Sequence, residues 1–454
     1  MNKAKKKEVL SLEEKLEQVL ISVDAQEYEV PENWCWVKIE SLVEICLGLT
    51  HTPTYVDKGI PFLSVKDITG GCIDFSDTKF IAREEYESLP YGAKPQKGDI
   101  LFARVGTIGA PQIVETDKEF GTFVSLGFFR TRSELISKKY IAYWINSILF
   151  EKQVSENVKG STLKNLNTGW LRHFHIPVPP ASEQQRIVEQ IESLFAKLDE
   201  AKEKISDVSK RCDDNMASIV HEAITGKLTE AWRIERGIRR DEWLVDKLGN
   251  LGTLERGRSK HRPRNDPRLF GGPYPFIQTG DVAEANVYIE KHRQTLSEFG
   301  VQQSRIFPKG TLCITIAANI GDVAILSYDC CFPDSVVGFT PYENIESKYI
   351  YYMMSELQKE IEANAPATAQ KNINLKILND VDIEIPTITE QKKIVELLEE
   401  LLSKEKEVKE KAEKTIDMID MMKKSILAKA FRGELGTNHP DEESAVELLK
   451  QIIL

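Results

Sequence analysis

Several features that would indicate a secreted or membrane-bound protein are missing from this chain of 454 residues. No apolar run approaches the roughly 18 residues that a membrane-spanning helix needs. The lysine-rich N-terminus is followed by a charged stretch, so no secretory signal is expected. The seven cysteines show no CxxC spacing, and their odd number argues against a complete disulfide framework. These absences predict a cytoplasmic protein with reduced thiols and no membrane partner.

Motifs that bind nucleotides or metals, or that supply a nucleophile, are also missing. The chain has no GxxxxGK[ST] loop, no HExxH pair, no GxSxG turn and no Asn-Pro-Pro-Tyr-type signature of a methyltransferase. Gly106 and Gly109 do not begin a helix-opening GxGxxG after a strand. His173 and His175 fit the wet face of an alternating strand better than a metal site. We therefore expect no catalytic residue, no metal and no cofactor in this chain.

A net positive charge is absent as well, because the formal charge is -11. This total argues only weakly against nucleic acid as a partner, since local patches matter more than the sum. One stretch interrupted by glycine and proline gathers the basic residues Arg256, Arg258, Lys260, His261, Arg262, Arg264 and Arg268. It is either a solvated loop or a surface for phosphates and guanine edges, which arginine can contact with two parallel hydrogen bonds.

The chain does contain a tandem repeat with a shift of about 207 residues. Glu183-Gln184 returns as Glu390-Gln391, and Gly226-Lys227-Leu228 returns as Gly433-Glu434-Leu435. Each copy combines short apolar strands and an aromatic-rich helix with a long helix at its end. The repeat predicts an α+β protein with two globular domains in tandem, each followed by a long helix, and the two helices pair as an antiparallel coiled coil.

The predicted domain boundaries follow from the repeat. They are 1–30 for an N-terminal amphipathic helical segment, 31–182 for the first domain, 183–230 for the first long helix, 231–389 for the second domain, 390–432 for the second long helix and 433–454 for a tail with a short helix.

Apolar residues recur at steps of four and three after both Glu-Gln pairs, which is typical of a heptad seam. The predicted seam comprises Ile187, Ile191, Leu194, Leu198, Ile205, Ile394, Leu398, Leu401, Val408 and Ile419. Each helix would be roughly 60 Å long at about 1.5 Å per residue. Such a pair would set the distance between the two domains.

Further candidates for DNA binding are hydroxyl, amide and basic side chains in turns and polar segments of both copies. Amides suit adenine edges, whereas hydroxyls and cations suit phosphates. The candidates are Thr50, His51, Lys66, Arg104, Thr107, Lys159, Ser161 and Lys164 in the first copy, and Gln278, Asn319, Gln370, Lys371 and Asn372 in the second. The segment at Thr50 and His51 lies at the place equivalent to the basic loop but carries less charge, so the two domains are expected to contact different things.

In this order the motifs resemble the specificity subunit of a type I restriction–modification enzyme, over nearly the whole length. The resemblance is carried by Val30-Pro31-Glu32-Asn33-Trp34, Ile176-Pro177-Val178-Pro179-Pro180, Glu183-Gln184-Gln185, Ile385-Pro386, Glu390-Gln391, Phe431-Arg432-Gly433-Glu434-Leu435 and Ser444-Ala445-Val446-Glu447-Leu448-Leu449. The chain departs from the family at Ile388 and Thr389, where a second proline group is common.

The resemblance implies a subunit without an active site, in which each domain reads one half of a split target in double-stranded DNA. It also implies that the helix pair sets the unread gap and docks two copies of a modification subunit, an adenine methyltransferase, beside restriction and translocase subunits. S-adenosylmethionine, ATP and Mg would belong to those partners. A free-standing DNA-binding module and a coiled-coil scaffold remain as alternatives, although a scaffold leaves the loop from Arg256 to Arg268 unexplained.

Overall fold

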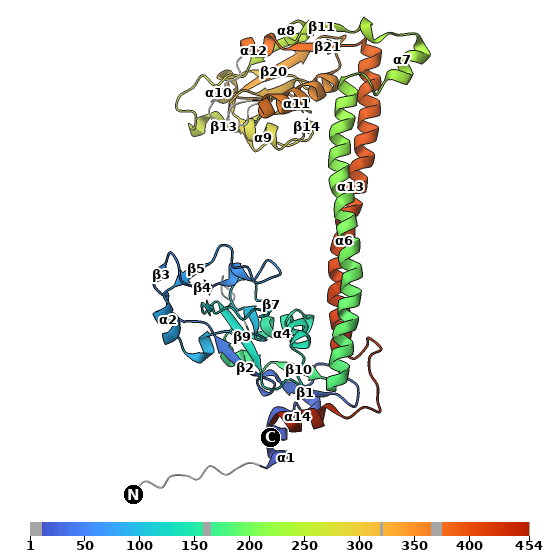
Figure 1. The fold of residues 1–454 in the computed structure, drawn as a ribbon. Helices are drawn as coiled ribbons and strands as arrows, with labels where there is room; N and C mark the ends of the chain where they lie inside the picture. Colours follow the sequence, from blue (N-terminus) through green and yellow to red (C-terminus); the bar gives the residue numbers. More distant parts are fainter. Residues whose placement is uncertain (1–10, 158–164, 318–320, 365–374, 454) are drawn as a thin grey trace. The chain divides into compact units, whose positions relative to one another are not determined.

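The computed structural model describes residues 11–157, 165–317, 321–364 and 375–453. The chain divides into a first unit, Met1–Ile205 with Lys414–Leu454, and a second unit, Ser206–Glu413. Two long helices, α6 (Ala181–Ile224) and α13 (Ile388–Phe431), each contribute to both units (Figure 1). Across the described ranges, no helix combines the length and the apolar character needed to cross a membrane.

The first unit contains short strands and helices besides its share of the long helices. Its strands are β1 (Cys35–Lys38), β2 (Val43–Leu47), β3 (Tyr55–Val56), β4 (Ile60–Leu63), β5 (Lys79–Ile81), β6 (Ile100–Ala103), β7 (Gly109–Ile113), β8 (Gly121–Thr122), β9 (Leu126–Thr131) and β10 (His175–Val178). Its helices are α1 (Leu12–Val19), α2 (Arg83–Ser88), α3 (Lys138–Ile145), α4 (Ile148–Asn157), α5 (Thr168–Leu171) and α14 (Ala445–Ile453).

The second unit is built in the same way. Its strands are β11 (Leu244–Lys247), β12 (Gly252–Arg256), β13 (Phe270–Phe276), β14 (Tyr288–Ile289), β15 (Gln294–Leu296), β16 (Ile306–Phe307), β17 (Leu312–Thr315), β18 (Val323–Leu326), β19 (Cys330–Cys331), β20 (Val336–Pro341) and β21 (Asp382–Ile385). Its helices are α7 (Glu230–Arg236), α8 (Leu248–Leu251), α9 (Thr279–Ala283), α10 (Glu298–Gln302), α11 (Ser347–Asn364) and α12 (Leu375–Asn379).

Each unit has a main sheet, a smaller sheet and a two-stranded ladder. The main sheets have the orders β2-β9-β6-β7 and β12-β20-β17-β18-β14, and the smaller ones β3-β5-β4-β8 and β15-β13-β19-β16. The helix α3 packs on β7 in the first unit, and α11 packs on β18 in the second. The ladders β1-β10 and β11-β21 pair the first strand of each unit with the strand that precedes its long helix.

The main sheets are apolar on both faces at their centres, because a separate core covers each face. In β6, Ile100 and Phe102 pack in one hydrophobic cluster, whereas Leu101 and Ala103 pack in another. All four side chains are fully buried. This explains why the central strands read as continuous apolar runs rather than as alternating ones.

The repeated Glu-Gln pair joins the start of each long helix to its own unit. In the first unit, the carboxylate of Glu183 is fully buried and accepts hydrogen bonds from Trp34 Nε1 at 2.7 Å and Asn438 Nδ2 at 2.8 Å. Gln184 accepts from the backbone N–H of Ser137 at 2.9 Å. The helix start is therefore tied to the first strand and to the segment that follows α13.

The second unit repeats this network with one change. Glu390 is fully buried and accepts from Trp243 Nε1 at 3.0 Å and from Thr229 Oγ1 at 2.8 Å. It also forms an ion pair with Arg233, 2.6 Å away, whose side chain is only 7% exposed. Among the described residues, Glu183 has no such cation. The Glu-Gln repeat therefore marks a structural junction, with a buried charge pair in one unit only.

The long helices run antiparallel within each unit. In the first unit, Lys202 contacts Asp420 at 2.6 Å, and Asp199 pairs with Lys423 one turn earlier on α6 and one turn later on α13. In the second unit, Asp213 contacts Lys409 at 2.6 Å and Asn215 contacts Glu405 at 3.3 Å. Each step forward along α6 matches a step backward along α13, which defines the antiparallel register.

The predicted seam is buried mainly in the first turns of each long helix. Ile187, Ile191, Ile394, Leu398 and Ile419 are buried, and Leu194, Leu198, Ile205 and Leu401 are half-buried. Val408 is instead 45% exposed, outside the seam. Ala412 and Ile419, later positions of the same four-three series, are buried, so the exposure is confined to Val408.

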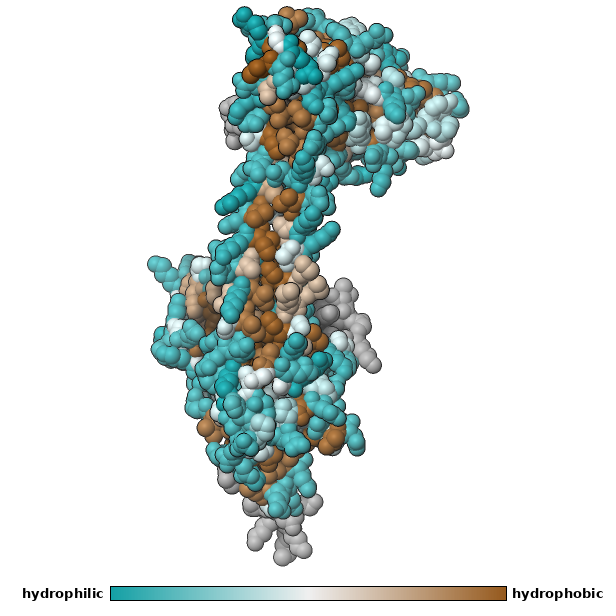
Figure 2. Space-filling view, turned by 90° about the vertical axis from the view of Figure 1, so that its right-hand side faces the viewer, coloured by the Kyte–Doolittle hydropathy of each residue, from teal (hydrophilic) through white to brown (hydrophobic). Residues whose placement is uncertain are grey.

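The helices also expose apolar side chains. Met418, Met421 and Met422 are 47%, 62% and 52% exposed in the first unit, and Val208 is 39% exposed in the second. Figure 2 shows apolar residues gathered along the paired helices. Exposed apolar patches of this kind mark interaction surfaces more often than accidental exposure.

Candidate nucleic-acid interface

The basic loop leaves the main sheet of the second unit at the end of β12 and ends where β13 of the smaller sheet begins. Its backbone is anchored, because Arg258 N donates to Phe332 O at 3.1 Å and Lys260 N donates to Gln303 O at 3.1 Å. At Gly257 an added Cβ would lie 2.3 Å from the carbonyl oxygen of Pro333. Only glycine allows this approach, so the base of the loop is held against the sheet while the side chains beyond it face solvent.

The basic side chains of the loop fall into two groups. Arg264 pairs with the carboxylate of Asp334 at 2.9 Å, and Arg268 pairs with Asp266 at 2.7 Å. Hydrogen bonds from Arg268 hold the pKa of the Asp266 carboxyl well below its usual range. Arg256 donates to the backbone carbonyl of Asp334. These three cations are therefore partly committed to the protein itself.

The remaining cations, Arg258, Lys260 and Arg262, are exposed and have no carboxylate partner in the part of the chain that the structure describes. Arg262 donates only to the carbonyl oxygens of Ser259 at 2.6 Å and His261 at 2.8 Å. His261 contacts Asp266 at 2.8 Å. The charge available to an anionic ligand is therefore concentrated in these three side chains.

A recess of about 180 Å³ opens beside the loop. Leu269, Phe276 and Leu296 line it and are buried. Arg258 and Gln278 also line it and are both exposed. The basic loop thus borders a small apolar hollow with a cation and an amide among its lining groups.

In the first unit, the equivalent loop begins at Gly48, where an added Cβ would lie 2.3 Å from the carbonyl oxygen of Phe123. Thr50 and His51 follow and are exposed. Lys66 is also exposed, but it contacts Asp77 at 2.7 Å. Thr107 is exposed at the turn between β6 and β7, where it lines a cavity beside α4. Within the described ranges, no recorded contact brings these four residues together.

Arg104 is expected on the DNA face, but its side chain is buried and only 6% exposed. Its guanidinium donates to the carbonyl oxygens of Leu166 at 2.7 Å and Val124 at 2.9 Å, and burial lowers its pKa. These contacts close the end of β6 against the segment at Leu166. The structure therefore places Arg104 inside the first unit, not on its surface.

The other candidates, Lys159, Ser161, Lys164, Asn319, Gln370, Lys371 and Asn372, lie outside the described residues.

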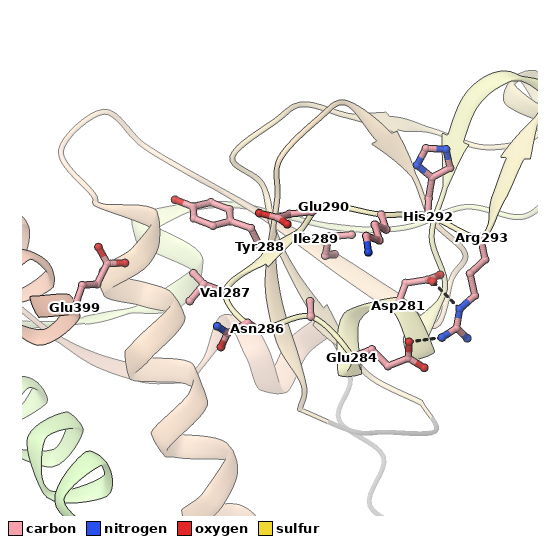
Figure 3. A pocket seen from close by; sticks show the side chains of 12 residues that line it. Asp281, Glu284, Asn286, Val287, Tyr288, Ile289, Glu290, His292, Arg293 and Glu399 are labelled. Atoms are coloured by element: carbon pink, nitrogen blue, oxygen red, sulfur yellow. Dashed lines mark hydrogen bonds and ion pairs between the residues drawn. The ribbon is translucent and has the colours of Figure 1, made fainter. Parts of the chain in front are cut away.

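A larger cavity of about 680 Å³ lies elsewhere in the second unit, between the segment 281–293 and α13 (Figure 3). Arg293 contacts Asp281 at 3.5 Å and also pairs with Glu284, so two carboxylates neutralise its charge. Glu399 of α13 borders the same cavity. No described cluster of histidine, cysteine or carboxylate side chains could hold a metal ion here or elsewhere. This cavity suits an anionic ligand less well than the basic loop.

Comparison with protein families gives two matches, one in each repeat. Residues 31–209 and 240–417 each match the type I restriction modification DNA specificity domain. The chain belongs to this family.

Relatives of this specificity-family chain match it along most of its length. The specificity subunit of the type I restriction enzyme EcoKI from Escherichia coli is 23% identical, over 93% of this chain and 96% of the relative. The putative MjaX specificity subunit from Methanocaldococcus jannaschii is 24% identical, over 86% of this chain and 92% of the relative.

Solved structures show the same fold. A chain from a study of assembly and conformational transition in a type I restriction–modification system matches with a TM-score of 0.72 at 20% identity, over 90% of this chain and 100% of that one. The HsdS subunit from Thermoanaerobacter tengcongensis matches with a TM-score of 0.59 at 20% identity, over 90% and 99%. The prediction of two tandem α+β domains with paired long helices is confirmed.

Several residues around the basic loop and its recess could not be identified from the sequence. Gln294 contacts Gln278, and Asp334 neutralises Arg264, from segments distant along the chain. Phe270 and Phe276 line the recess but read as ordinary residues of a strand. The alternation of β15 was the available signal for Gln294, because it places this residue on an exposed face.

Proposed function

We propose that this chain is the DNA-recognition subunit of a type I restriction–modification complex, in which each unit reads one half of a bipartite target. The observation that carries the proposal is the presence of two complete family domains, each joined to a long helix, in one chain. The relatives are named specificity subunits, which recognise rather than catalyse. The partners are double-stranded DNA and the other subunits of the complex, in the cytoplasm.

The helix pair is assigned two further roles in this proposal. It sets the unread gap between the half-sites, and it docks two copies of a modification subunit. The exposed Met418, Met421 and Met422 support docking, because they offer an apolar surface next to charged residues of the same helices. S-adenosylmethionine, ATP and Mg belong to the partner subunits.

The test is to express this chain with its modification subunit and to map N6-methyladenine across DNA by single-molecule sequencing. The expected result is a new split motif that disappears when this chain is omitted. A stable complex that produces no new methylation would contradict the proposal.

The spacer role has its own test. One heptad inserted at equivalent points of α6 and α13 should lengthen the helix pair by about 10 Å, which corresponds to roughly three base pairs. The methylated motif should then keep both half-sites and gain a longer gap. A changed half-site sequence with an unchanged gap would contradict this role of the helices.

A further inference from the structure

The side chain of Gln278, beside the basic loop, is held in one orientation. Its backbone N–H donates to Asp281 Oδ2 at 2.8 Å, which fixes the start of α9. Its side-chain Nε2 donates to Gln294 Oε1 at 2.8 Å. Gln294 lies directly opposite Phe276 in the β13–β15 pair. The amide therefore lies beside the recess, between the end of β13 and the start of α9, and is held against β15.

This arrangement leaves a defined pair of hydrogen-bonding groups. One N–H of Gln278 is used by Gln294, so the second N–H and the carbonyl Oε1 remain for a ligand. Adenine offers a matching acceptor at N7 and a matching donor at N6 in the major groove. Guanine offers two acceptors, O6 and N7, and needs two donors. As long as Gln294 accepts from Nε2, Gln278 presents one donor and one acceptor, which fits adenine and not guanine.

The recess supplies a second feature of the same base pair. Thymine carries a methyl group at the major-groove edge, and proteins contact it through apolar side chains. Phe270 and Phe276 line the recess beside Gln278. The neighbouring Arg258 is exposed and pairs with no described carboxylate, so it can hold the DNA backbone at this point.

We propose that Gln278, oriented by Gln294, reads the adenine of one A·T pair in the half-site of the second unit, with the thymine methyl facing the apolar recess. The inference rests on the proposed function and adds to it the identity of one base pair and the residues that select it. Gln278 is the contacting residue, and Gln294 is a positioning residue.

The test uses the full chain assembled with its modification subunit and duplexes that carry the mapped target. Each A·T pair of the second half-site is replaced in turn, by 7-deazaadenine to remove N7, by uracil to remove the methyl group, and by a G·C pair. At one position, the G·C replacement should weaken binding roughly 5- to 150-fold, the usual discrimination of a bidentate amide contact. Both modified bases should weaken binding at the same position.

Two variants assign the effect to side chains. Gln278→Ala should remove the preference at that position and leave the other positions unchanged. Gln294→Leu should keep adenine binding but reduce the discrimination against guanine, because the amide of Gln278 can then rotate. Gln302→Ala is the matched control, since Gln302 is an exposed glutamine of α10 that does not line the recess.

The outcomes separate this inference from the function on which it rests. Unchanged discrimination at every pair in Gln278→Ala, or a second half-site without an A·T pair, would overturn the assignment of Gln278. Unchanged discrimination against guanine in Gln294→Leu would overturn the positioning role. If the unaltered complex shows no sequence preference at all, the proposed function fails instead.

Discussion

The two units place a loop at the same point of the same sheet and fill it with different side chains. After β2 and after β12, a glycine packs against an opposing carbonyl oxygen at a distance that excludes any Cβ. Beyond Gly48 the first unit continues with Thr50 and His51, whereas beyond Gly257 the second continues with Arg258 and Lys260. The backbone contact preserves the position of the loop, while its exposed side chains can vary without disturbing the core.

The buried junctions differ in a similar way, and this difference should have the largest effect on stability. Glu390→Gln leaves the buried Arg233 without its counter-charge, so we expect the free energy of unfolding of the second unit to fall by about 3–5 kcal/mol. Glu183→Gln replaces a buried carboxylate that has no cationic partner among the described residues, so we expect the free energy of unfolding of the first unit to fall by about 1–3 kcal/mol.

Amide hydrogen exchange measured on the full chain can separate the two units. Exchange should accelerate more in the β11–β21 ladder for Glu390→Gln than in the β1–β10 ladder for Glu183→Gln. Equal losses would show that the ion pair between Glu390 and Arg233 adds nothing beyond the hydrogen bonds that both junctions share.

The loops can be compared through the salt dependence of DNA binding. Replacing Arg258, Lys260 and Arg262 by alanine should weaken binding at every sequence and reduce the salt slope by about one unit per cation. Arg256 is left unchanged because it already donates to Asp334. The measurement is the affinity of the assembled complex for its target across a salt series.

Thr50→Ala with His51→Ala is the matched change in the first unit, and it should leave the salt slope as it is. A slope that is unchanged in the triple variant of the basic loop would show that phosphates are contacted elsewhere.

Arg104 allows a third comparison, because it occupies the place of Ile316 in the second unit. Arg104 N donates to Ser125 O at 2.9 Å, and Ile316 N donates to Ser335 O at 2.9 Å. Arg104→Ala should lower the free energy of unfolding of the first unit by about 1–3 kcal/mol, because the carbonyl oxygens of Leu166 and Val124 lose their hydrogen-bond donor. Thermal or denaturant unfolding would measure the loss. If Arg104→Ala reduced the salt slope of DNA binding and left the stability unchanged, Arg104 would be a DNA contact instead.

The smallest expected effect concerns pH. His175 stands opposite Lys38 in the first ladder, where the second ladder pairs Asp382 with Lys247. Burial lowers the pKa of His175 below its usual value of 6.5. The unfolded chain therefore binds the proton more readily, so the β1–β10 ladder should lose stability as the pH falls through about 6.5 toward the lower folded pKa.

Hydrogen exchange at pH 7.5 and pH 5.5 would check this, with the β11–β21 ladder as the internal reference. His175→Gln should remove the pH dependence. If the β1–β10 ladder became more protected relative to the β11–β21 ladder at pH 5.5, the direction of the pKa shift would be contradicted.

Local patterns account for the features of the fold that could be predicted. The Glu-Gln pairs and the four-three spacing of apolar residues predict two long helices because both signals lie within a few turns of one chain segment. Val408 is the exception, because it is exposed although Ala412 and Ile419 of the same series are buried, and a local repeat does not record which apolar positions the partner helix covers.

The candidate site was predictable only in part. The basic character of residues 256–268 is visible in the sequence, but the partners of its cations are not. Arg264 is neutralised by Asp334, seventy positions away. Arg104 shows the same limit, because an arginine in a strand-turn segment reads as exposed until the carbonyl oxygens that it binds are known.

By itself, the sequence determined the tandem repeat, the long helices and the basic loop, because each depends on residues close together along the chain. The tertiary structure alone decided which cations stay free, that Arg104 is buried and that Gln278 is oriented by Gln294 above an apolar recess. These depend on side chains from segments separated along the chain, and only the tertiary packing brings them within hydrogen-bonding distance.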